Sequence, residues 1–179
     1  MAALDRAPGV DVPRSAHPIA LDLRANGTPI PGDFQYEKSE GAIECLSYVS
    51  SMSAAARAGS GVAGSVGRRV HEGITIRKAI DRATPLLARA LCFGESIEAT
   101  FRFFRESPYG DGSYEQFFTV EIDQARLTAI TLVSPDGLSN PADTPRAPAF
   151  EDVQFTFGRI VWRYEPDGIE FEDVWNARL

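Results

Sequence analysis

Alternation of hydrophobic and polar positions is the main pattern along the chain, and it is typical of β-strands. In the first such segment, Ile19, Leu21 and Leu23 fall at every second position, so their side chains share one face. The pair Asn26-Gly27 then predicts a turn. Seven further segments are predicted as strands, at residues 43–48, 73–77, 97–103, 118–122, 127–134, 153–164 and 169–175.

The phase of the alternation changes once inside a predicted strand. Hydrophobic residues hold odd-numbered positions from Val153 to Phe157 and even-numbered positions from Ile160 to Tyr164. One extra residue in a strand has this effect, so we predict a β-bulge at Gly158-Arg159.

A single helix is predicted between the strands at 73–77 and 97–103. Thr84 is the expected N-cap, Pro85 the first helical residue and Gly94 the stop. Leu87 and Leu91 are four residues apart and share the face expected to close one end of the sheet core. The predicted fold is therefore mostly β, an antiparallel β-barrel or closed sandwich with one flanking α-helix.

Three segments carry no such pattern. Residues 1–17 are rich in Pro, Ala and charge and are predicted to be a flexible N-terminal extension, which leaves 18–179 as a single β-barrel domain. Residues 50–67 are mostly Ser, Ala and Gly and are predicted to be a long mobile loop, and 135–148 form a second, proline-rich loop. Within the first loop, residues 59–64 match a dinucleotide fingerprint but lack its flanking strand and helix, so no cofactor is expected.

Composition narrows the class of protein. The chain has 179 residues, 44% of them hydrophobic, which suits one globular domain. No apolar run reaches the roughly 18 residues of a membrane span, and residues 1–13 lack the apolar core of a signal peptide, so we expect a protein made and folded in the cytoplasm. Cys45 and Cys92 are far apart and suit buried free thiols in a reducing compartment.

Charge is distributed unevenly. The net charge of −7 argues against binding to nucleic acid or to anionic membranes. Residues 68–89 nevertheless hold six basic and two acidic residues, a net charge of +4. Two interpretations remain open for this basic segment: a solvated face, or one half of a self-association contact whose acidic half lies elsewhere.

No catalytic, cofactor-binding or metal-ligating residue is predicted. The four His and Cys residues are too far apart in sequence for a local ligand pair, and His71 is expected at the surface. A Gly-x-Ser-x-Gly elbow is absent from the sequence. A glycosidase pair such as Glu98 and Glu121 is conceivable, but nothing in the sequence selects it. The chain is therefore not expected to be an enzyme.

The segment from Gly73 to Leu87, GITIRKAIDRATPLL, resembles the haemolysin-coregulated protein family, the tube subunit of bacterial type VI secretion. The family signature is a strand, a basic residue, an apolar pair, Asp-x-Ala-Ser/Thr-Pro and a Leu-rich helix ended by Gly. Segments 43–48 and 155–164 extend the resemblance, which covers residues 19–175. The signature residues matched are Asp81, Ala83, Thr84, Pro85, Leu87 and Gly94.

This resemblance implies a β-barrel with one helix on its flank that forms six-fold rings, stacks them into a tube and holds small effectors in the lumen. The implied partners are further copies of the chain and the type VI sheath, spike and effector proteins, with export of the folded protein and no signal peptide. With the chain ending shortly after the last strand, we expect a plain tube subunit without a C-terminal toxin domain. The loop at 50–69 is implied to reach a neighbouring subunit or ring, and the residues to test there are Gly59, Gly61, Gly64, Arg68 and Arg69.

Two alternatives stay open at this level. One is a monomeric β-barrel that binds a small ligand, suggested by the inward-facing phenylalanines at 101, 103, 155 and 157. The other is a hydrolase that uses uncommitted carboxylates. A lumen filled by the phenylalanine rings would argue against the first.

Overall fold

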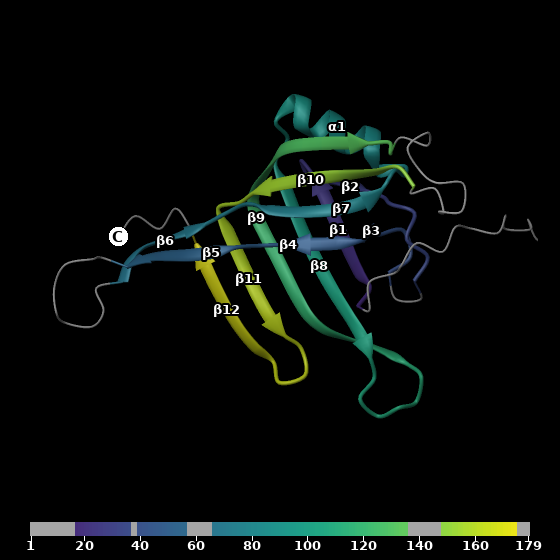
Figure 1. The fold of residues 1–179 in the computed structure, drawn as a ribbon, viewed down its shortest axis with the longest axis vertical. Helices are drawn as coiled ribbons and strands as arrows, with labels where there is room; N and C mark the ends of the chain where they lie inside the picture. The colour runs from purple at the N-terminus through teal and green to yellow at the C-terminus, as the bar shows by residue number, and fades with distance from the viewer. Residues whose placement is uncertain (1–16, 37–38, 57–65, 136–147, 175–179) are drawn as a thin grey trace, which may run out of the picture.

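The computed structural model describes residues 17–36, 39–56, 66–135 and 148–174. Ten strands form one continuous antiparallel sheet that folds over on itself, with β10, β7 and β4 running across the other layer (Figure 1). The predicted extension at 1–17 lies, apart from His17, outside the described residues. The strands of this sheet are β1 (Ile19–Ala25), β2 (Thr28–Ile30), β3 (Ile43–Cys45), β4 (Ser47–Val49), β7 (Ile74–Ala79), β8 (Ile97–Glu106), β9 (Tyr114–Val133), β10 (Phe150–Thr156), β11 (Arg159–Tyr164) and β12 (Ile169–Val174).

Strand β9 joins the two layers. It is one strand of 20 residues, where the sequence predicted separate strands at 118–122 and 127–134. Its first half pairs with β8 and β11, and its second half pairs with β10. Between the halves, Gln124 adopts a φ of 51°, a left-handed conformation that bends the chain without ending the strand.

The core lies between the two layers. The predicted alternation is confirmed in β1, where Leu21 and Leu23 are buried and Asp22 is exposed. Phe101 of β8 and Phe155 of β10 are fully buried, and their rings meet edge to face with centroids 5.9 Å apart. Buried rings in contact with each other at this place argue against the small-ligand alternative.

The change of phase at Gly158 marks a change of strand rather than a bulge. Strand β10 ends at Thr156 and pairs with β7, whereas β11 begins at Arg159 and pairs with β12 and the first half of β9. A β-carbon at Gly158 would lie 2.8 Å from the side-chain oxygen of Gln124. Glycine therefore permits the close approach of these two segments at the crossing.

Helix α1 spans Ala83–Phe93 and ends as predicted, with Gly94 in the left-handed conformation at φ 60°. Its predicted start is wrong, because Arg82 and not Thr84 is the N-cap residue. The carboxylate of Asp81 accepts the hydrogen bond of the Ala83 amide at 2.8 Å and satisfies one of the free donors at this terminus. This helix, at the top of Figure 1, is the only helix among the described residues, and its 11 residues are too few to span a membrane.

The mostly β, antiparallel fold with one helix is confirmed, whereas closure into a barrel is not. The hydrogen-bonded path through the described strands begins at β2 and ends at β4, with β3 branching from β1 and with β11 and β12 branching from β9. Leu46, between β3 and β4, donates its amide to the carbonyl of Arg77 at 2.7 Å. The short β3–β4 segment thus passes from the β1 edge of the sheet to the β7 edge.

The predicted mobile loop at 50–67 is wrong where the structure describes it. Strands β5 (Met52–Ala56) and β6 (Val66–His71) pair with each other in a separate two-stranded sheet. We call these two strands the projecting hairpin. Its first strand is mostly Ala and Ser, so it has no hydrophobic alternation by which the sequence could have shown it.

Candidate functional site

The projecting hairpin extends away from the ten-stranded sheet, beside the end of β12 (Figure 1). Its register places Met52 opposite His71 and Ser53 opposite Val70. The exposed fractions of Met52 and Val70 are 57% and 45%. Met52 shares the face of His71 and Val70 lies on the opposite face, so the hairpin exposes an apolar side chain on each side.

One carboxylate, that of Asp173 in β12, attaches the hairpin to the sheet. The Nε atom of Arg69 donates to Oδ2 of Asp173 at 2.6 Å, and Nη2 of Arg69 binds Oδ1. The Nε2 atom of His71 lies 2.7 Å from the same Oδ2 and donates to it, because an ionised carboxylate only accepts. The hydrogen bond from Arg69, aided by that from His71, lowers the pKa of Asp173 against the opposing effect of burial.

Aromatic rings complete this attachment. The imidazole of His71 stacks on Trp162 with centroids 5.9 Å apart and meets Phe157 edge to face at 5.6 Å. Trp162 in turn stacks on Phe171. The side chain of His71 is only 6% exposed, so the expectation of a surface histidine is wrong. The contacts that bury it come from residues about 90 to 100 positions later in the chain.

The structure describes only part of the sequence-predicted site. Gly59, Gly61 and Gly64 lie outside the described residues. Arg68 lies in β6, and its side chain is likewise outside the description. Arg69 is described and turns toward Asp173 of the same chain. Sequence reasoning missed Asp173 and His71. Asp173 follows Ile169 and Phe171 at every second position, and a carboxylate in this hydrophobic series is the signal that could have found it.

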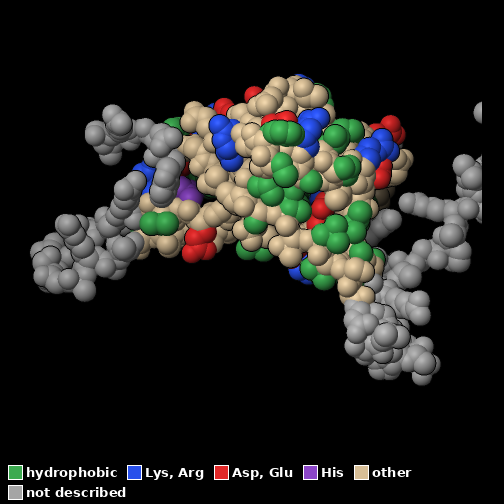
Figure 2. All heavy atoms as spheres, turned by 90° about the horizontal axis from the view of Figure 1, so that it is seen from above, with side chains coloured by type: hydrophobic (Ala, Val, Ile, Leu, Met, Phe, Trp, Pro, Cys, Tyr) green, Lys and Arg blue, Asp and Glu red, His purple; other side chains and the backbone are tan. Residues whose placement is uncertain are grey.

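The basic segment at 68–89 is largely neutralised within the chain. Each of its basic side chains that the structure describes has a carboxylate partner. On the face shown in Figure 2, basic side chains lie scattered among acidic ones. The acidic half that the sequence left unlocated is therefore found mainly in the same molecule. The pairs are Arg69–Asp173, Arg77–Asp152, Lys78–Glu151, Lys78–Asp81, Arg82–Asp33 and Arg89–Glu95.

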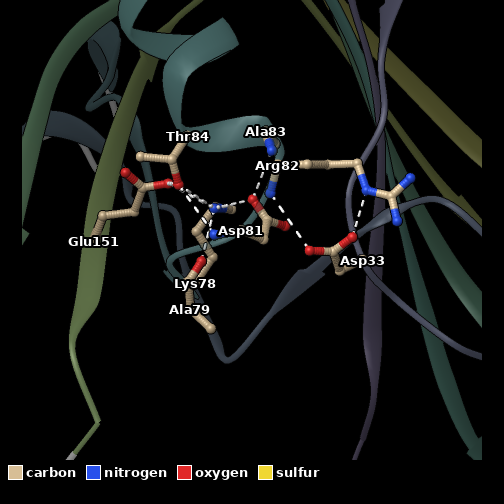
Figure 3. Close-up of polar contacts among 8 residues, drawn as sticks. All are labelled: Asp33, Lys78, Ala79, Asp81, Arg82, Ala83, Thr84 and Glu151. Carbon is tan, nitrogen blue, oxygen red and sulfur yellow. Dashed lines mark hydrogen bonds and ion pairs between the residues drawn. The ribbon is translucent and has the colours of Figure 1, made fainter. Parts of the chain in front are cut away.

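A buried polar cluster holds the start of helix α1 against β7 and β10 (Figure 3). Lys78 is fully buried, and its ammonium group donates to Glu151 at 2.6 Å, to Asp81 at 2.7 Å and to the carbonyl of Ala79 at 2.8 Å. The hydroxyl of Thr84 also donates to Glu151, at 2.8 Å. The signature residues that carried the family resemblance thus have a structural role, since they fix the helix to the sheet.

A shallow groove of about 520 Å³ crosses strands β1, β8, β9 and β11. Both Glu98 and Glu121 line it, together with Asp22, Arg24 and Arg159. Several of these charges pair with neighbours, including Arg159 with Glu172. Among the described residues, no three His, Cys, Asp or Glu side chains are grouped as metal ligands.

Comparison with known proteins agrees with this fold. The family model described as "Type VI secretion system effector, Hcp" matches residues 23–164. A curated relative, "Major exported protein" of Pseudomonas aeruginosa strain PAO1, is 32% identical over 114 residues. That match covers 62% of this chain and 63% of the relative, so the chain spans somewhat less than two thirds of the relative's length.

Solved structures share the fold at lower sequence identity. A double mutant of Hcp1 from Escherichia coli EAEC 042 superposes with a TM-score of 0.73 at 22% identity, covering 88% of this chain and 98% of that one. Secreted protein Hcp3 from Pseudomonas aeruginosa superposes with a TM-score of 0.68 at 21% identity, covering 90% and 99%. The family match spans most of the chain and confirms the resemblance found in its sequence, and we conclude that the chain belongs to the Hcp family of the type VI secretion system.

Proposed function

We propose that this chain is a structural, non-enzymatic tube subunit that forms six-membered rings, stacks them and carries effectors in the ring lumen. Membership of the Hcp family supports the type VI assignment. The observation that carries the ring and stack is the projecting hairpin, which presents Met52 and Val70 to solvent while its base is held by Asp173. Export of the folded chain is supported by the name of its curated relative, a major exported protein.

The physical requirement is a surface that contacts a different surface on the next copy. Such head-to-tail contacts close into a ring when the rotation allows it, and a second contact that does not close produces an open stack. A hairpin that extends beyond the ten-stranded sheet is suited to the contact between stacked rings. Among the described strands, β12 pairs only with β11, so we propose its other edge for the contact that closes the ring.

The remaining parts of the proposal follow from the sequence. Residues 18–179 form one domain that closes as a barrel, and the sheath, spike and effector proteins are its partners. Gly59, Gly61, Gly64 and Arg68 are the residues proposed to meet the neighbouring ring. Arg69 acts instead within its own chain, where it pairs with Asp173.

The test is the solution mass of the tag-free protein, measured by light scattering after size exclusion at several concentrations. We expect six times 19.5 kDa, about 117 kDa, with larger stacks at high concentration. The double variant Met52→Asp/Val70→Asp is expected to keep the ring mass and lose the stacks. Leu132→Asp, at an apolar residue of similar exposure in β9, is the matched control and should keep both. A persistent mass of 19.5 kDa would overturn the proposal.

A further inference from the structure

We propose that Asp173 is a positioning residue, which holds Arg69 and His71 and thereby sets the direction in which the projecting hairpin leaves the sheet. The hairpin then meets a second copy of the chain at a defined angle. Only this last step rests on the proposed function. The positioning itself is a property of the single chain.

The hairpin needs such a residue because its strands have no backbone pairing with the larger sheet. Strand β5 pairs with β6 alone, and the two form a sheet of their own. The chain connects the hairpin to β4 on one side and to β7 on the other, and the amide of Glu72 donates to the carbonyl of Ser51 at 2.9 Å between these two connections. Side-chain contacts with the sheet add to this backbone link in setting the direction of the hairpin.

Two contacts on one strand fix a direction, whereas one contact is only a pivot. Arg69 and His71 are two residues apart in β6, so their side chains lie on the same face, about 6.6 Å apart along the strand. Both reach the carboxylate of Asp173, Arg69 through two nitrogens and His71 through Nε2. The stacking of His71 on Trp162 adds a third contact on the same side.

The position of Asp173 is unusual for a carboxylate. It lies opposite Ile160, a core residue, in a strand whose preceding same-face residues are Phe171 and Ile169. Those two residues are 63% and 65% exposed, whereas the aspartate, beside the core, is only 6% exposed. A buried charge is costly unless it is paired, so its presence is accounted for by the two partners that the hairpin supplies.

The direct test measures hairpin direction by the distance between two spin labels. Labels are placed at Ser53→Cys in β5 and at the exposed Glu98→Cys in β8, in a Cys92→Ser background, and the labelled protein is diluted into an excess of unlabelled protein. We expect one narrow distance distribution for the parent and a clearly broader one for Asp173→Asn, which keeps the shape and removes the charge. Equal widths would overturn the positioning role.

Asp152→Asn is the matched control. Asp152 also accepts two hydrogen bonds from one arginine, Arg77, at 2.7 and 2.8 Å, but that pair joins β10 to β7 within the larger sheet. Its distance distribution should stay as narrow as that of the parent. Broadening of equal size in both variants would mean general loosening of the fold and would also overturn the proposal.

A second variant approaches the contact from the hairpin. Arg69→Lys keeps the charge and loses the two-pronged geometry, so we expect broadening between that of the parent and that of Asp173→Asn. Arg69→Ala combined with Asp173→Asn should broaden the distribution no further than Asp173→Asn alone. If Asp173→Asn does not fold, the comparison of Arg69→Lys with the parent still decides, because Arg69 is half exposed and its replacement leaves the core untouched; an unchanged width would then overturn the proposal. Additive broadening would show that the two residues act separately and would contradict the proposal.

Solution mass separates this inference from the proposed function. If Asp173→Asn broadens the distribution and also loses the stacks, both stand. If the distribution broadens while stacking is unchanged, the positioning role of Asp173 stands, and the proposed role of the hairpin in stacking is overturned. If a parent that remains at 19.5 kDa has a narrow distribution that broadens in Asp173→Asn, the inference survives without the ring.

Discussion

Lys78 and Glu151 form a fully buried ion pair, 2.6 Å between Nζ and Oε1, that joins β7 to β10 beneath the start of helix α1. The same ammonium group also binds Asp81. The other oxygen of Glu151, Oε2, is buried without a hydrogen-bond partner in the structure. The cluster is therefore incompletely satisfied, and its stability depends on the lysine charge.

Replacing Lys78 with methionine should be strongly destabilising, because it leaves the carboxylate of Glu151 buried without its cation. We expect a loss of about 3–5 kcal/mol in the free energy of unfolding, measured by urea denaturation. The double variant Lys78→Met/Glu151→Leu should recover part of this loss, since the buried carboxylate of Glu151 is removed together with its cation, while Asp81 still lacks the lysine. A double variant less stable than Lys78→Met alone would contradict this account.

Gly73→Ala should destabilise the pairing of β7 with β10. A β-carbon at Gly73 would lie 2.5 Å from the carbonyl oxygen of Phe155, which is backbone and cannot move aside cheaply. We expect a cost of about 1–3 kcal/mol, as for other overpacked sites. Thermal unfolding measures it. Gly27 has a positive φ, and a methyl group there would meet nothing within 4 Å. The variant Gly27→Ala therefore measures the cost of a positive φ without a clash. If Gly73→Ala unfolds at the parent temperature, the clash does not exist.

The contribution of Asp173 to stability should disappear in acid. Its pKa is lowered from the ordinary value of 3.8, chiefly by the hydrogen bond from Arg69. A lowered pKa means that the stabilisation is complete above the unfolded value and is lost as pH falls through the folded value. The difference in unfolding free energy between the parent and Asp173→Asn should be constant near neutral pH and shrink below about pH 4. Denaturant titrations from neutral pH downward test it, and a difference that grows as the pH falls would contradict it.

The two cysteines should differ in reactivity. Cys45 is buried in the core, and burial raises the pKa of its thiol, whereas Cys92 on helix α1 is exposed. The thiolate is the reactive form, so a thiol-specific reagent should modify one cysteine rapidly in the folded protein and both after denaturation. The Cys92→Ser variant should lose the rapid phase. The sequence had predicted two buried thiols, and the structure corrects that prediction for Cys92.

Local pattern was enough to predict most of the strands and the end of the helix. Alternation reports which side chains share a face, and Gly94 ends α1 by a conformation that other residues rarely adopt. The start of the helix was misplaced because its acceptor is the carboxylate of Asp81, while Thr84 is engaged with Glu151. That second contact joins residues 67 positions apart, which no local pattern reports.

The candidate site was predictable only in outline. Family resemblance located it in the segment from 50 to 69, but a composition rich in Ala and Ser concealed strand β5 and its pairing with β6. The sequence shows the basic segment only as a local excess of positive charge. The carboxylates that neutralise it, such as Asp152 for Arg77, become visible only when the strands are paired.

The amino-acid sequence by itself determined the strand content, the single helix and the family, because these depend on residue spacing along the chain. The tertiary structure alone decided that Asp173 holds Arg69 and His71, residues 104 and 102 positions earlier. In the sequence, Asp173 is one acidic residue among 25 Asp and Glu. It acquires its role because β12 brings it to the base of the projecting hairpin, where burial makes the paired charge necessary.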